Sequence, residues 1–124
     1  MIIAVDFDGT VVTHEYPKIG RDVGAVPVLR NILDKGHQLI LLTMRSGKLL
    51  DEARDWFKLK NLELWGVNTN PEQCSWTQSP KCYAHIYIDD AALGCPLITI
   101  VGSGERPYVD WVKVHEMLSV RGII

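Results

Sequence analysis

The sequence predicts an α/β domain built on a mainly parallel sheet, and three observations support this. Short apolar runs alternate with amphipathic segments along all 124 residues, which is typical of strand-helix units. Several of the apolar runs end in a polar or acidic residue. The length suits one hydrophobic core, since such cores usually use roughly 100 to 150 residues. We therefore predict a single domain over residues 1–124.

Five apolar runs are candidates for the strands of this sheet. Three of them are rich in aliphatic residues and bounded by turn-forming segments: residues 2–7, 38–43 and 84–88. Residues 62–67 and 96–101 are weaker or edge candidates.

Three helices are expected between and after these strands. Apolar side chains recur at helical spacing over about residues 22–35, and Gly36 stands where a C-terminal glycine is common. Ser46 can cap a second helix, whose apolar face would be Leu49, Ala53, Trp56 and Phe57. A third helix is expected over residues 107–121, starting at a proline. Residues 12–20 and 68–80 read as loops, either functional or merely solvated.

Composition and charge exclude several classes of protein. With 23% charged residues and a net charge of -2, the chain has no basic field that would bind nucleic acid. Its apolar runs are far shorter than the roughly 20 residues that span a bilayer, and no signal peptide is recognisable at Met1. We expect a cytoplasmic protein. The three cysteines form no C-x-x-C pair and the four histidines show no metal-ligand spacing, so neither disulfides nor a zinc site is expected.

The clearest local pattern is Asp6-Phe7-Asp8-Gly9-Thr10, which directly follows an apolar run. Carboxylates two residues apart on a strand project to the same side, about 7 Å apart, and can face one bound group. The same pattern also fits a turn in which an aspartate caps its own backbone. The rest of the chain decides between these interpretations.

Three further elements carry candidate site residues. Thr43 closes an apolar strand with a hydroxyl, although threonine favours strands in any case. Lys81 precedes the strand at residues 84–88, where a solvated surface charge would be equally ordinary. Asp89 and Asp90 close that strand, and adjacent acids repel each other unless a cation or a proton intervenes.

In this order, the Asp6 motif, Thr43, Lys81 and the Asp89-Asp90 pair resemble the four motifs of the haloacid dehalogenase (HAD) superfamily. Lys58 and Lys60 are alternatives to Lys81 for the third motif. The resemblance implies a Rossmann-like three-layer sandwich with the site at the carboxyl ends of its strands. It also implies a member without a cap domain, because helix and strand consume most of the sequence between the motifs.

The resemblance implies a magnesium-dependent phosphate monoester hydrolase that forms an aspartyl-phosphate on Asp6. Asp8 would be the general acid and base, and Thr43 and Lys81 would bind the transferring oxygens. The Mg²⁺ ligands would be the Asp6 carboxylate, the Asp8 carbonyl and Asp90, with Asp89 either a ligand or a neighbour that orients one. Backbone groups near the first two motifs would also contact the substrate, at Phe7, Gly9 and Met44.

Two side chains beside these motifs have open roles. Arg45 lies two residues after Thr43 and either binds an anionic substrate or forms a structural salt bridge. Trp76 either stacks on a substrate ring or anchors its loop to the core.

Two other functions remain open. A phosphomutase or phosphotransferase would use the same fold, whereas a phosphate-responsive binding module would use similar residues without catalysis. The expected substrate is a phosphorylated small molecule or macromolecule. A homo-oligomer is possible, and a membrane or nucleic-acid partner is not indicated.

Overall fold

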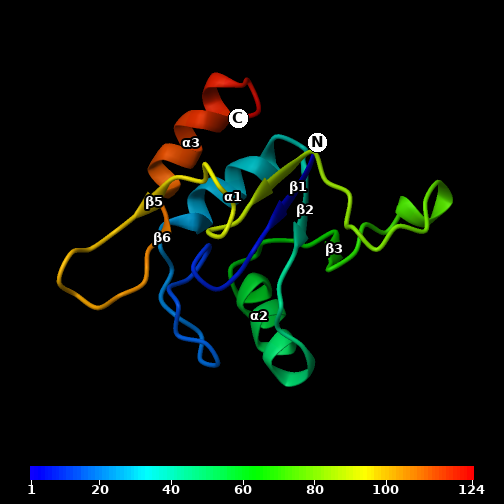
Figure 1. Cartoon of the computed structure of the whole chain (residues 1–124). Coiled ribbons are helices and arrows are strands. Elements are labelled where there is room, and N and C mark those ends of the chain that lie inside the picture. Colours follow the sequence, from blue (N-terminus) through cyan, green and yellow to red (C-terminus); the bar gives the residue numbers. More distant parts are fainter.

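A four-stranded parallel sheet forms the centre of the computed structural model, which describes residues 1–124. The strands lie in the order β3-β2-β1-β4, with bounds β1 Ile2–Val5, β2 Gln38–Leu41, β3 Gly66–Val67 and β4 Ile86–Ile88. In the parallel register Val5 is opposite both Leu41 and Ile88. The carboxyl ends of β1, β2 and β4 therefore meet at one edge of the sheet (Figure 1).

All three α-helices pack on one face of the sheet: α1 Ala25–Asp34, α2 Gly47–Leu59 and α3 Trp111–Val120. Ile3 and Val5 of β1 point to this face, where they share a buried apolar cluster with side chains of every helix. Figure 1 shows α1 and α3 side by side, with α2 near the carboxyl end of β2. The helices thus enclose the core beneath the strand ends that carry the predicted motifs.

The opposite face of the sheet is covered by the segment between β3 and β4. Ala4 and Ile40 pack there against Cys82 and Ala84 in a second, smaller apolar cluster. This segment contains only a 3₁₀ turn, η1 Gln73–Ser75, and extends away from the helices in Figure 1. The α/β fold and its parallel sheet are confirmed, and the third layer of the sandwich is an irregular segment rather than a helix.

The C-terminal part differs from the prediction for residues 96–101 and 107–121. Leu97–Ile98 (β5) pairs antiparallel with Tyr108–Val109 (β6), outside the parallel sheet. Consequently α3 starts at Trp111, not at Pro107, and Asp110 caps it by accepting from the N–H groups of Val112 and Lys113. The predicted proline start was wrong because the residues after it extend a hairpin.

The first helix also starts later than expected. The Asp22 carboxylate accepts from the N–H groups of Gly24 and Ala25, and Gly24 has a φ of 96°, a left-handed conformation that glycine adopts without strain. This turn delays the helix to Ala25. None of the α-helices combines the length and apolarity needed to cross a membrane.

Candidate active site

Three carboxylates converge where β1 and β4 end. Asp6 continues β1 and donates its N–H to Ile88 O of β4 at 3.0 Å, which aligns it with Asp89 and Asp90. Oxygens of these three acids lie within 4.8 Å of one another. The predicted meeting of the first and fourth motifs is thus present in the geometry.

Thr10 links two of these acids. Its Oγ1 donates to Asp6 Oδ2 at 2.9 Å, lies 3.3 Å from Asp90 Oδ1, and accepts from Asp90 N at 3.1 Å. Thr10 itself is fully buried. The first turn after β1 therefore fixes the acids of both strands relative to each other.

Asp6 has an unusual electrostatic environment. Its pKa is raised to about 7, mainly by burial and also by the neighbouring Asp89 and Asp90, while the Thr10 hydroxyl and the Phe7 N–H act in the opposite direction. Half of such carboxyl groups carry a proton at neutral pH. A cation beside Asp6 would favour its ionised form.

The donor set fits magnesium. Asp6, Asp89 and Asp90 offer only carboxylate oxygens, and Mg²⁺ prefers oxygen ligands from one or two carboxylates with retained waters. The Asp8 carbonyl oxygen, a further predicted ligand, accepts no hydrogen bond within the protein. No histidine or cysteine joins the group of three acids, so a thiolate or imidazole metal site is not formed here.

Thr43 lies beyond the end of β2, and its backbone N–H is already hydrogen-bonded within the protein. Its N–H donates to Asn68 Oδ1 at 2.7 Å, and its Oγ1 accepts from Arg45 N at 3.2 Å. The Thr43 hydroxyl proton is then free to donate to a ligand. The Met44 N–H has no acceptor in the protein, while the Met44 side chain points to solvent. The Thr43 hydroxyl and the Met44 N–H can therefore both donate to an anion at this edge of the sheet.

Asp8 is held by Arg45, away from the three acids. Arg45 Nε donates to Asp8 Oδ2 at 2.8 Å and Arg45 Nη2 to Asp8 Oδ1 at 2.7 Å, a bidentate ion pair of the strong kind. The Arg45 side chain is 1% exposed and that of Asp8 16%. The hydrogen bonds that Arg45 donates to Asp8 raise the pKa of Arg45 above its usual value.

The remaining donors of Arg45 are also used. They reach the carbonyl oxygens of Pro17, Lys18 and Leu49 at 2.8 to 3.4 Å, and a guanidinium has only five N–H groups. The guanidinium carbon also lies 5.1 Å from the Phe7 ring centroid and 5.3 Å from that of Tyr16. Arg45 therefore forms the structural salt bridge, one of the two roles that the sequence left open.

Phe7 and Gly9, where backbone contacts with substrate are expected, differ in the groups that the fold leaves free. The Phe7 side chain is fully buried and packs edge-on against Trp56 at 5.8 Å, so only its backbone can face a ligand. The Gly9 N–H donates to Val12 O at 2.7 Å. Gly9 instead provides space, because a Cβ at this position would collide with the ring of His14.

Lys81 approaches from the segment that covers the far face of the sheet. Its Nζ lies 5.9 Å from the ring centroid of Tyr87, which stands on β4 two residues before Asp89. No ion pair joins Lys81 to any of the acids. Its predicted role in binding the transferring oxygens stays a prediction.

The structure adds residues that the sequence did not indicate. His14 Nε2 lies 2.8 Å from Asp90 Oδ2, Asn68 binds the Thr43 N–H, and the Trp111 indole donates to Thr10 O at 2.7 Å. These contacts span 25 to 101 residues. No local spacing in the sequence could have found them. Trp76 packs edge-on against Tyr83 with ring centroids 5.4 Å apart, which favours its anchoring role.

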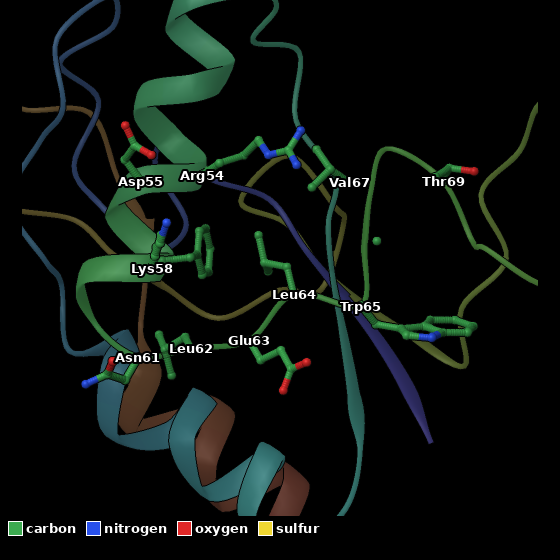
Figure 2. Close-up of a pocket in the computed structure, with 12 residues that line it drawn as sticks. Arg54, Asp55, Lys58, Asn61, Leu62, Glu63, Leu64, Trp65, Val67 and Thr69 are labelled. Carbon is green, nitrogen blue, oxygen red and sulfur yellow. The ribbon is translucent and has the colours of Figure 1, made fainter.

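A separate hollow of about 860 Å³ lies between α2 and the edge strand β3. Figure 2 shows Asp55 and Lys58 of α2 on one side and Leu62 to Leu64 on the other. Charges of both signs line it, and the only candidate from the sequence among them is Lys58, the alternative to Lys81. The hollow is therefore distinct from the acidic site.

Comparison with known proteins finds a relative of known structure. The chain is similar to a conserved protein from Bacteroides thetaiotaomicron of known structure, with 37% sequence identity and a TM-score of 0.79. The similarity covers 98% of this chain and 91% of that one. No family model and no curated protein matches the sequence.

Proposed function

The chain belongs to the same family as the conserved Bacteroides thetaiotaomicron protein, and we propose that it is a magnesium-dependent phosphate monoester hydrolase acting through an aspartyl-phosphate on Asp6. The observation that carries this proposal is the convergence of Asp6 with Asp89 and Asp90 at the sheet edge. Residues more than 80 positions apart in sequence come together there. The resemblance to the HAD superfamily names the same residues independently.

The first step is attack by Asp6 on phosphorus. A carboxylate oxygen of Asp6 forms a bond to phosphorus while the bond from phosphorus to the ester oxygen breaks, and an acyl phosphate results. The hydroxyl of Thr43 and the N–H of Met44 would donate to the phosphoryl oxygens. Mg²⁺ held by Asp6, Asp89, Asp90 and the Asp8 carbonyl would supply positive charge against the phosphate dianion and the clustered acids.

Asp8 would transfer the protons of both steps. It donates a proton to the leaving ester oxygen, then takes one from the water that attacks phosphorus and releases Asp6. Arg45 orients the Asp8 carboxylate through two hydrogen bonds.

The substrate is a phosphate ester that an open site can admit. The acids lie at a sheet edge without a cap domain above them, so either a phosphorylated small molecule or a phosphorylated macromolecule fits. Neither the Arg45 guanidinium nor the Phe7 ring is available to select the leaving group.

Replacing the nucleophile tests the proposal. We expect the purified protein with Mg²⁺ to hydrolyse p-nitrophenyl phosphate, and Asp6→Asn to lower kcat by at least about 10³-fold because an amide cannot attack phosphorus. The control is Asp55→Asn, an exposed acid of α2, which should keep the rate. A rate for Asp6→Asn close to that of the wild type would refute the assignment.

The fate of the phosphoryl group separates the alternatives. Mass spectrometry of the Asp6 peptide after rapid quenching should detect a phosphoryl group that forms on Asp6 and is then released as phosphate. A stable phosphoryl group on Asp6 without release of phosphate would instead indicate a phosphate-responsive binding module. Transfer to an added alcohol in preference to water would indicate a phosphotransferase.

Leaving-group dependence tests Asp8. Asp8→Asn should slow hydrolysis of an alkyl phosphate more than that of p-nitrophenyl phosphate, by about 10²-fold or more, since nitrophenolate leaves without a proton. The ratio of kcat/KM for the two esters is the measurement. Equal losses for both esters would contradict the general-acid role.

A further inference from the structure

His14 contacts one of the proposed metal ligands from the loop that follows β1. Its Nε2 lies 2.8 Å from Asp90 Oδ2, and the two side chains are 13% and 15% exposed. The ring rests directly on Gly9, where any Cβ would collide with it. The absence of a side chain at Gly9 therefore makes room for His14 beside Asp90.

Asp90 is held at its carboxylate and at its backbone. His14 engages Oδ2, while Thr10 Oγ1, whose proton goes to Asp6, accepts the Asp90 N–H and lies 3.3 Å from Oδ1. By contrast, the Asp89 carboxylate accepts only from the N–H of Ala91 in its own turn. Of the two adjacent acids, Asp90 is the one fixed by a different segment of the chain.

The imidazole is not itself placed as a ligand of the three-acid group. That group, defined by atoms within 4.8 Å of one another, contains Asp6, Asp89 and Asp90 without His14. A ring with its proton on Nε2 donates to Asp90 Oδ2. Groups that hydrogen-bond a ligating carboxylate orient it, and losing one typically costs about 10- to 100-fold in metal affinity.

We propose that His14 is a positioning residue that fixes the Asp90 carboxylate and thereby sets the affinity of the site for Mg²⁺. The inference rests on the magnesium site of the proposed function and goes beyond it by assigning a residue that contacts neither phosphorus nor the leaving group. His14 orients Asp90, and Thr10 orients both Asp90 and Asp6. The loop after β1 thus controls acids on two strands.

Isothermal titration calorimetry with MgCl₂ on the full chain tests this without any substrate. His14→Ala should raise the Kd for Mg²⁺ by about 10- to 100-fold. His14→Gln keeps a side-chain N–H donor and should restore much of the affinity. His115→Ala, at an exposed position of α3, is the matched control and should bind like the wild type.

Three outcomes are distinguishable. A Kd for His14→Ala equal to that of the wild type overturns the His14 proposal alone. A raised Kd for His14→Ala that returns toward the wild-type value in His14→Gln supports the proposal. This holds even if the wild type hydrolyses no phosphate ester, a result that would overturn only the proposed hydrolase activity. Wild-type protein that binds no Mg²⁺ overturns both. Melting curves of each variant without metal show whether a loss of Mg²⁺ affinity comes from misfolding. If His14→Ala misfolds, the Kd of His14→Gln decides the question in its place.

Discussion

Asp6 and Asp8 leave the same strand two residues apart, yet their surroundings are opposite. Asp8 faces a buried guanidinium that binds both of its oxygens. Asp6 faces two further carboxylates, and its pKa rises to about 7 through burial and their charge. The chain therefore supplies its own cation to one acid and surrounds the other with like charges. Under the proposed function, this difference would separate a proton carrier that is held in place from a nucleophile that needs a bound metal.

The largest expected effect comes from removing the internal cation. Arg45→Met leaves the Asp8 carboxylate and three carbonyl oxygens without their donor, and breaking a buried ion pair on one side costs about 3 to 5 kcal/mol. Urea denaturation of the variant and the wild type measures the free energy of unfolding. Asp8→Leu combined with Arg45→Met should recover part of the loss, because no uncompensated charge remains. Unchanged stability in Arg45→Met would contradict the contrast between Asp8, which Arg45 holds, and Asp6, which has no cation of its own.

An effect of comparable size should appear in the pH dependence of stability without metal. The pKa of Asp6 rises from 3.8 to about 7 on folding. As pH rises through this window the unfolded chain loses the Asp6 proton while the folded one keeps it, so the folded state binds more protons and stability falls. The full contribution is about 4 kcal/mol.

The Asp6→Asn variant isolates this contribution. In the presence of a chelator we expect it to match the wild type at pH 4 and to exceed its melting temperature at pH 8. The difference between the two melting curves, followed from pH 4 to pH 8, is the measurement. A constant difference across that range would show that Asp6 titrates normally.

The smallest predicted effect is the stabilisation by magnesium. At an Mg²⁺ concentration 100 times its Kd, binding should stabilise the wild type by about 2.7 kcal/mol. Asp90→Asn should lose most of this gain, while its stability without metal is kept or raised because one repelling charge is gone. Asp8→Asn retains the carbonyl oxygen of residue 8 and should keep the gain. Melting temperatures at increasing MgCl₂ compare the three proteins, and equal gains in Asp90→Asn and wild type would exclude Asp90 as a ligand.

The sheet and its acidic edge could be predicted because their signals are local. An apolar run followed by aspartate identifies a strand and its carboxyl end, and parallel strands bring such ends together. Asp6, Asp89 and Asp90 were found in this way. The β5–β6 hairpin was missed because Pro107 is as compatible with a helix start as with an extended chain.

The partners of the acids could not be predicted, because they depend on contacts between distant segments. Arg45 and Asp8 are 37 residues apart, and His14 and Asp90 are 76 apart. The sequence left Arg45 with two roles, and only the geometry of its five donors decides between them. His14 stands at no metal-ligand spacing from another histidine in the sequence. Its contact in the structure is with a carboxylate that follows β4.

The hydrogen bond from Trp111 to Thr10 has a consequence for the order in which the molecule is made. It joins residues 101 positions apart, and Thr10 is the group that links Asp6 to Asp90. During translation Asp6 leaves the ribosome well before Trp111, whose indole holds the turn at Thr10. A nascent chain that ends before Trp111 has both pairs of acids without this support. We therefore expect the turn that links Asp6 to Asp90 to be complete only after α3 docks.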